Sequence, residues 1–341
     1  MSDRPSPAFV AFSDVAFGSR TVPSEEIDAA FGMPSGKLRQ RAGIRSVAHA
    51  GERETEVTLG SQAARGALRA ASLAAEAIDW ILAGSETHHA FPSLAAQLHL
   101  AVGARETCGA MDIGGACLGF LNALAVAKAF VESRQGSNVL VVTADVHSRT
   151  LTPGRVAGEF GGLFGDGALA FLVQSAMPGA QPASFALRDF FFGCAVQYQR
   201  AIQVCAEPND QLRVVFDGDA LSRAATARMD ECIRELERRS GVTRGEVAAF
   251  ATHQPNPRLV ALLAKKIGVP VERFPPVADV RGNLGSTTCA AALHFALQRA
   301  SEEDPHMRKP IFLASLGPGL LYGGGWLAPA LSHTNGERSS G

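Results

Sequence analysis

Hydrophobic and polar positions form one repeating pattern in the first half of the chain. An apolar run at residues 80–83 leads into a polar turn at 84–89 and then into an amphipathic stretch at 92–102. Apolar runs of this length are typical of buried strands, and apolar positions three to four apart are typical of a helix. The pattern therefore predicts a strand, a loop and a helix in that order.

The second half shows the same pattern. An apolar run at residues 247–251 is followed by a polar turn at 253–256 and by a helical stretch at 259–267 that closes at Gly268. Because the order of elements repeats, we predict that the chain is internally duplicated.

Each unit continues in a parallel way, with a strand, a turn of small residues, a long Ala-rich helix and a strongly apolar strand. We expect these at residues 110–113, 117–132 and 139–143 in the first half and at 277–280, 286–300 and 311–314 in the second. Strands that are apolar at nearly every position predict mostly parallel sheets with helices on both faces. The predicted fold class is a layered α/β fold with pseudo-twofold symmetry.

Domain boundaries follow from composition. Pro, Gly and Ser cluster at residues 175–182, which predicts the bridge between an N-terminal half at 1–178 and a C-terminal half at 179–331. The polar, glycine-rich residues 332–341 are predicted to form a disordered tail.

Composition narrows the functional classes. The 341 residues are 46% hydrophobic, and 32 basic and 33 acidic residues are interleaved to a net charge of -1, which favours neither nucleic acid nor a membrane surface as partner. No apolar run suits a membrane span or a leader, so a cytoplasmic location is predicted. The six cysteines have irregular spacing, and His88, His89 and His294 lack further ligands at metal-site spacing, so we expect neither disulfides nor a metal or cofactor.

Cys117 is the first candidate for chemistry. It lies in Gly-Gly-Ala-Cys-Leu-Gly-Phe at residues 114–120, between a predicted strand and a predicted helix. A thiol at a helix N-terminus meets the positive end of the helix dipole and free N–H groups, which lower its pKa and offer an oxyanion site. A cysteine in this position is either a nucleophile or a packing residue.

His253 and Asn283 are two further candidates. His253 opens a turn stiffened by two prolines, and Asn283 lies in a glycine-rich turn. Alone, either could be purely structural. Because all three residues follow elements of related units, they can converge at a pseudo-symmetric centre.

Six segments of the chain resemble motifs of the ketoacyl-ACP synthase III branch of the thiolase superfamily. They occur in the family's order at residues 41–45, 90–93, 112–120, 163–168, 253–256 and 282–283. The resemblance implies a thiolase-like αβαβα fold and places the family's catalytic Cys, His and Asn on Cys117, His253 and Asn283.

The implied reaction is a decarboxylative Claisen condensation. Cys117 would take an acyl group from an acyl-CoA or acyl-ACP donor, and a malonyl-type thioester, carried by an acyl carrier protein, would lose CO2. His253 and Asn283 would donate hydrogen bonds to the resulting enolate.

The resemblance also implies binding roles. Arg41, Phe91, Asn256 and Gly319 would contact substrate or pantetheine, and Phe91 would reach the partner's acyl pocket in a homodimer. Arg258, Lys265 and Lys266 either receive an acidic carrier protein or form an ordinary exposed helix face.

Three positions depart from the family pattern. Lys37 lies where the family has a tryptophan that stacks on the adenine of CoA, and Leu284 follows Asn283 in place of a small polar residue. Pro318 lies in the C-terminal glycine loop, where the family usually has a glycine whose N–H helps to hold the oxyanion, and proline has no N–H to donate. This loop resembles the one in type III polyketide synthases. These departures indicate a specialised member of the family, and both fatty-acid synthesis and secondary metabolism remain open as its pathway.

Two other functions are compatible with these residues. An acyltransferase would pass the acyl group from Cys117 to a hydroxyl or an amine, and a silent partner subunit would carry out no chemistry. The presence of Asn283 favours condensation, because an enolate needs two donors, and a silent subunit has no use for the three residues.

Overall fold

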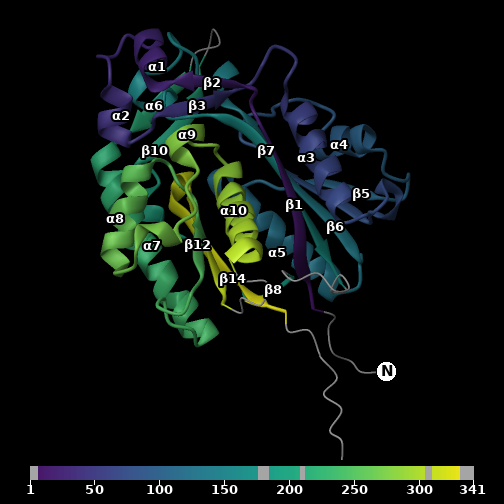
Figure 1. Cartoon of the computed structure of the whole chain (residues 1–341). Helices are drawn as coiled ribbons and strands as arrows, with labels where there is room; N and C mark the ends of the chain where they lie inside the picture. The colour runs from purple at the N-terminus through teal and green to yellow at the C-terminus, as the bar shows by residue number, and fades with distance from the viewer. Residues whose placement is uncertain (1–6, 176–183, 208–211, 304–308, 331–341) are drawn as a thin grey trace, which may run out of the picture.

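The computed structural model describes residues 7–175, 184–207, 212–303 and 309–330 (Figure 1). The predicted boundary between 178 and 179 and the predicted tail at 332–341 lie outside these residues. Within them the chain folds as alternating strands and helices around one large sheet.

The sheet has ten strands in the order β12-β13-β14-β8-β1-β7-β6-β4-β5, with β9 paired to β14. Their bounds are β1 Phe9–Phe17, β4 Trp80–Gly84, β5 Gly109–Asp112, β6 Asn138–Val146, β7 Asp166–Gln174, β8 Phe185–Leu187, β9 Phe191–Cys194, β12 Ala249–Thr252, β13 Ile311–Gly317 and β14 Leu321–Pro329. Two small two-stranded antiparallel sheets pair β2 (Arg20–Pro23) with β3 (Ser46–His49) and β10 (Ile202–Ala206) with β11 (Leu212–Phe216).

The prediction of mostly parallel sheets is wrong. β4 pairs in parallel with β5 and β6, and β12 with β13, but the other six pairings of the large sheet are antiparallel. The antiparallel strand β7 is buried at eight of its nine positions, because helices cover both faces of the sheet. An apolar run therefore indicated burial and not strand direction.

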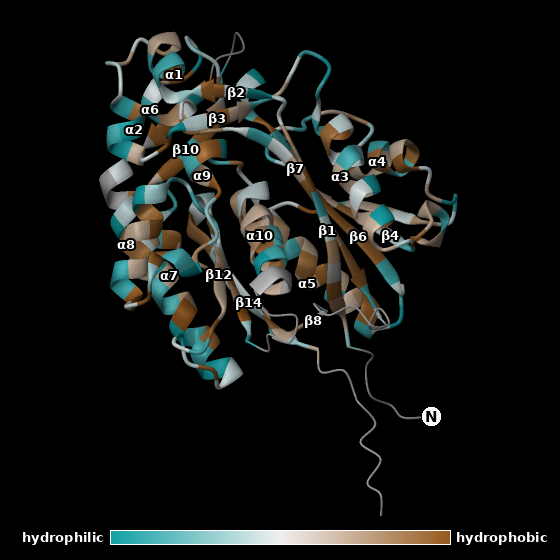
Figure 2. Cartoon of the chain, in the orientation of Figure 1, coloured by the Kyte–Doolittle hydropathy of each residue, from teal (hydrophilic) through white to brown (hydrophobic). Residues whose placement is uncertain are grey.

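The helices cover the sheet in layers. Their bounds are α1 Ser24–Ala30, α2 Lys37–Ala42, α3 Glu56–Ala70, α4 Leu94–Val102, α5 Gly119–Glu132, α6 Gly158–Gly161, α7 Gly218–Ser240, α8 Pro257–Ile267, α9 Ala278–Arg281 and α10 Thr287–Glu303. Helices α3 and α4 pack on β1, β4 and β6 and form one outer layer. Helices α7 and α8 cover β13 and β14 and form the opposite outer layer. Figure 2 shows α7 and α8 as mixtures of hydrophilic and hydrophobic residues, as outer helices require.

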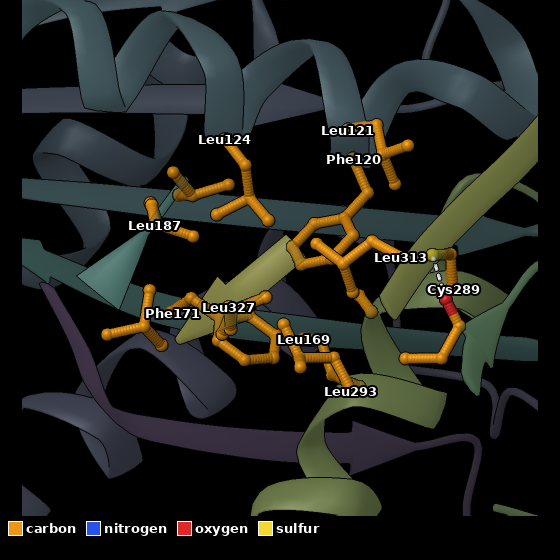
Figure 3. Packing of buried hydrophobic residues seen from close by; sticks show 14 of the residues in the cluster. Phe120, Leu121, Leu124, Leu169, Phe171, Leu187, Cys289, Leu293, Leu313 and Leu327 are labelled. Atoms are coloured by element: carbon orange, nitrogen blue, oxygen red, sulfur yellow. Dashed lines mark hydrogen bonds between the residues drawn. The ribbon is translucent and has the colours of Figure 1, made fainter. Parts of the chain in front are cut away.

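Helices α5 and α10 form the central layer. Phe120 and Leu124 of α5 and Leu293 of α10 are buried in one cluster with Phe171 of β7 and Leu313 of β13 (Figure 3). Each fully buried side chain of this kind contributes about 1.5–3 kcal/mol of transfer free energy. Both helices contact β6 and β7 on one side and β13 on the other, so the single sheet wraps around them and supplies both β layers of the predicted αβαβα arrangement. The N-terminal ends of α5 and α10 lie together in this central layer.

The predicted strand at residues 277–280 is also wrong. Ala278–Arg281 forms the single helical turn α9, which ends at Gly282 with a positive φ of 77°. A four-residue apolar segment does not distinguish a strand from a helical turn. The duplicated halves therefore match in their long helices and final strands and differ just before Asn283.

Candidate active site

One cavity of about 700 Å³ brings Cys117, His253 and Asn283 together. Its walls are mainly apolar, with Met229 of α7 and Leu263 of α8 among the lining side chains. The three residues therefore lie together, as the sequence predicts. The cavity is also large enough for an acyl chain.

Cys117 lies on a tight turn between β5 and α5. Gly115 and Ala116 both have positive φ, at 128° and 49°, and a short 3-10 turn over Ala116–Leu118 leads into the helix. The hydroxyl of Ser315, in β13, donates a 2.7 Å hydrogen bond to the Cys117 carbonyl oxygen. A neighbouring strand thereby fixes the backbone that presents the thiol.

The expected lowering of the Cys117 pKa is wrong for the unacylated enzyme. Burial raises the pKa of this thiol well above its ordinary value, and the negative charge of Glu86 raises it further. The backbone N–H at the helix start acts in the opposite direction but is the weaker influence. The Cys117 side chain is therefore a thiol at rest, and it would need a base in order to attack as a nucleophile.

His253 follows β12, and its backbone N–H donates to the Ala314 carbonyl oxygen in β13 at 3.1 Å. Burial lowers the pKa of its imidazole to about 4, although the charge of Glu86 acts against this shift. The ring is therefore neutral at physiological pH. A neutral imidazole keeps one N–H, which is a hydrogen-bond donor.

Asn283 is held by its backbone and by one side-chain atom. Its N–H donates to the Leu163 carbonyl oxygen at 2.8 Å. Its Oδ1 accepts from the Gly285 N–H at 3.0 Å and from the Thr288 hydroxyl at 3.2 Å. Because the oxygen is occupied, the amide NH2 is the part of the side chain that remains to donate into the cavity.

The predicted binding residues fall into two groups. Arg41, Asn256 and Arg258 line the cavity, and Asn256 also caps α8 by accepting the Leu259 N–H at 3.0 Å. Gly319 is not among the lining residues, although its neighbours Pro318 and Leu320 are.

The other three predicted residues lie away from the cavity. Phe91 is 98% exposed, and Lys265 and Lys266 are exposed in the last turn of α8. Lys37, at the position that departs from the family, lines the cavity and forms an ion pair with Glu159. Both partners are partly exposed, so this ion pair marks the solvent end of the cavity.

Three functional candidates were missed in the sequence. Glu86 lines the cavity, and Asp145 and His147 lie behind it at the end of β6. Burial raises the pKa of Asp145 to about 6. Polar residues two apart at the end of an apolar strand were the available signal for Asp145 and His147.

A cysteine, a neutral histidine and an asparagine that line one apolar cavity, in this layered fold, are typical of condensing enzymes of the thiolase type. A model of the 3-oxoacyl-[acyl-carrier-protein (ACP)] synthase III family matches residues 111–189, and a model of that family's C-terminal part matches residues 237–328. The chain belongs to the 3-oxoacyl-[acyl-carrier-protein] synthase III family, whose members are acyl-transferring condensing enzymes.

Individual relatives support this assignment. The beta-ketoacyl-[acyl-carrier-protein] synthase III of Serratia proteamaculans is 31% identical over 288 residues, which is 83% of this chain and 87% of the relative. The 3-oxoacyl-[acyl-carrier-protein] synthase III of Aquifex aeolicus superimposes with a TM-score of 0.81 at 26% identity, over 94% of this chain and 99% of the other. The priming beta-ketosynthase of the R1128 polyketide pathway gives a TM-score of 0.81 at 26% identity, over 96% and 98%.

Two further observations concern the described residues. Among their helices none combines the length and apolarity that crossing a membrane requires. Their His, Cys, Asp and Glu side chains also form no group of three or more that could hold a metal ion.

Proposed function

We propose that the enzyme carries an acyl group on Cys117 and condenses it with a malonyl-type thioester. In the first step the Cys117 sulfur attacks the carbonyl of an acyl-CoA or acyl-ACP. The carrier sulfur leaves with the proton that the thiol gives up, and a new thioester remains on the enzyme.

In the second step the malonyl-type thioester loses CO2, and its electron pair forms an enolate. The N–H of His253 and the amide of Asn283 donate to the enolate oxygen. The enolate carbon attacks the acyl-Cys117 carbonyl, the Cys117 sulfur leaves, and the product is a 3-oxoacyl thioester. The observation that carries this proposal is the pair of neutral donors, because decarboxylation places negative charge on an oxygen that such donors stabilise.

The binding roles belong to the same proposal. Arg41 and Asn256 contact the pantetheine arm, with Gly319 in the neighbouring loop, and the ion pair of Lys37 with Glu159 replaces an aromatic contact to adenine. A cavity that has apolar walls and a charged end at the solvent suits an acyl thioester carried on a long polar arm.

Macromolecular partners follow from exposed side chains. Arg258, Lys265 and Lys266 are exposed on α8, where they can receive an acidic carrier protein. The 98% exposed Phe91 is suited to a homodimer interface, in which it would enter the partner's acyl pocket. The proposed setting is the cytoplasm, in a fatty-acid or secondary-metabolite pathway.

The nucleophile is tested with a panel of acyl-CoAs and acyl-ACPs and intact mass spectrometry. We expect one acyl adduct, mapped to Cys117 and absent from Cys117→Ser. Cys194→Ser is the matched control, because Cys194 is the exposed thiol, and it should acylate normally. An adduct that persisted in Cys117→Ser would refute the assignment.

The condensation step is tested with Asn283→Ala. This variant should acylate at the wild-type rate and lose at least about 100-fold in CO2 release from malonyl-ACP, since removal of one oxyanion donor costs about 10²–10³. Normal decarboxylation by the variant would contradict the mechanism. Acyl transfer from wild-type Cys117 to hydroxyl or amine acceptors, without CO2 release from any carboxylated thioester, would do the same.

A further inference from the structure

Glu86 places a carboxylate beside the nucleophile. It follows β4 directly after Ser85, lines the cavity with Cys117, and has a side chain that is 16% exposed. The two side chains line the same cavity, and the charge of Glu86 raises the pKa of the thiol. Its Oε1 is buried and makes no hydrogen bond of standard geometry with the described residues, so it is available to accept a proton.

The loop that carries Glu86 is held by hydrogen bonds to Asp145. The Glu86 backbone N–H donates to Oδ1 of Asp145 at 2.5 Å, and the Ser85 hydroxyl donates to the same oxygen at 3.2 Å. Asp145 is fully buried. The position of Glu86 is therefore built into the sheet and does not depend on a flexible loop.

His147 is a second neighbour of the Glu86 carboxylate. Its Nε2 is 3.5 Å from Glu86 Oε2, and its Nδ1 lies 3.1 Å from the Gly165 carbonyl oxygen. A carbonyl oxygen can only accept, so Nδ1 carries a proton, and a proton on Nε2 as well gives an imidazolium facing the carboxylate.

The pKa values agree with this ion pair. Burial alone would neutralise both groups, but the contact with Glu86, with the charges of Asp145 and Asp166, raises the pKa of His147 to about 9. Burial likewise opposes ionisation of Glu86, yet His147 outweighs it and the net pKa of Glu86 is lowered. Glu86 is therefore ionised when substrate arrives.

We propose that Glu86 is a catalytic residue that accepts the proton of Cys117 during acylation and returns it to the departing carrier sulfur, with His147 as its positioning residue. The S–H bond breaks toward Oε1 as the sulfur–carbonyl bond forms. The bond from the carbonyl carbon to the carrier sulfur then breaks, and the carrier sulfur takes the proton from the Glu86 carboxyl. Glu86 ends as a carboxylate, and no further reactant is needed.

The structure favours Glu86 over His253 for this step. The largest side-chain influences on the thiol are Glu86 and Asp145, and both are carboxylates. His253 is the neutral donor that the enolate needs later, and it is not among the groups that act on the thiol. The two half-reactions thereby use different side chains around one sulfur.

The inference rests on the proposed acylation of Cys117, and the test is Glu86→Gln, measured with two probes. The first probe is hexanoyl N-acetylcysteamine thioester, whose transfer to Cys117 is followed by intact mass spectrometry. The second is iodoacetamide, which alkylates whatever thiolate is present. The matched control is Glu132→Gln, a partly exposed carboxylate at the far end of α5, which should leave both rates unchanged.

The two rates should change in opposite directions. Acylation of Glu86→Gln should fall about 100-fold or more, since a lost general base costs about 10²–10⁴. Alkylation at mildly alkaline pH should rise several-fold, because the charge that raises the thiol pKa is gone. If both rates rise, Glu86 only repels the thiolate; if acylation is unchanged, Glu86 is not the base. Either result overturns the proposal.

A second variant tests the positioning role and does not alter Glu86. His147→Gln keeps a hydrogen-bond donor but removes the positive charge. The pKa of Glu86 should therefore rise, because burial and the charge of Asp145 raise it and only the weaker influences of Cys117 and His253 are left to lower it. The acid limb of the acylation rate should therefore move to higher pH. A limb at the wild-type pH would refute the positioning role.

These tests separate the proposals. Failure of Asn283→Ala to block decarboxylation refutes condensation and leaves the acylation chemistry of Glu86 intact. Normal acylation by Glu86→Gln refutes the base and leaves the condensation proposal intact.

Discussion

The buried neutral state of His253 has a measurable consequence for stability. The folded protein holds the pKa of this imidazole at about 4 because of burial, against 6.5 for an unperturbed histidine. The unfolded chain therefore binds more protons at His253 between these two pH values. By linkage, the stabilisation is fully present above about pH 6.5 and is lost as the pH falls toward 4.

The size of the effect follows from the two pKa values. Between about pH 7.5 and about pH 5, the shift from 6.5 to about 4 makes His253 alone lower the free energy of unfolding by about 2 kcal/mol. His253→Gln cannot take up a proton, so this part of the acid sensitivity should disappear. Urea unfolding of both proteins at the two pH values measures it, because the other titrating groups are common to both.

The control and the refuting result are both simple. His89→Gln removes an exposed imidazole and should keep the wild-type loss. If His253→Gln lost as much stability as the wild type on acidification, folding would not lower the pKa of His253. The argument that burial keeps this imidazole neutral would then be wrong.

Two other predictions concern the turn that presents the thiol. Ser315→Ala should lower the free energy of unfolding by about 1–3 kcal/mol, because it leaves the Cys117 carbonyl oxygen buried without a hydrogen bond. The control Ser133→Ala removes a 2.7 Å hydrogen bond of the same kind on an exposed helix surface and should cost under about 0.5 kcal/mol. Equal losses in urea unfolding would contradict the argument. Gly317→Ala would place a methyl group 2.9 Å from the Gly115 carbonyl oxygen, so we expect the free energy of unfolding to fall by about 1–3 kcal/mol and acylation to slow. The control Gly245→Ala, whose new methyl group would lie 3.8 Å from its nearest atom, should show neither change in the same two assays.

The catalytic candidates Cys117, His253 and Asn283 could be predicted from the sequence because each has a local signal. Each polar residue directly follows an apolar or small-residue segment, and the segments recur in the same order in both halves. The strands before Cys117 and His253, β5 and β12, each pair in parallel with a neighbour, and the carboxyl ends of parallel strands form the edge of a sheet at which sites gather.

Glu86 could not be predicted in the same way. It is one of several polar residues in the turn at 84–89, and no periodicity indicates which of them points inward. Its direction is set by Asp145 and His147, about sixty positions later in the chain. The raised pKa of Cys117 follows first from burial and then from the charge of Glu86, and both depend on the tertiary structure. The helix-start argument, which is local, therefore gave the wrong direction.

Hydrogen bonds between the two halves explain how the site keeps its geometry through both half-reactions. Asp145 accepts from the Glu86 loop on one oxygen and from the Ser286 N–H and hydroxyl, at 3.0 and 2.6 Å, on the other. Ser286 starts the segment just after Asn283, so one buried carboxylate positions both the proposed base and the loop of the enolate donor. In return, β13 holds the Cys117 carbonyl through Ser315. The acylating and condensing groups are thus fixed to each other, and a shift in either half would disturb both steps.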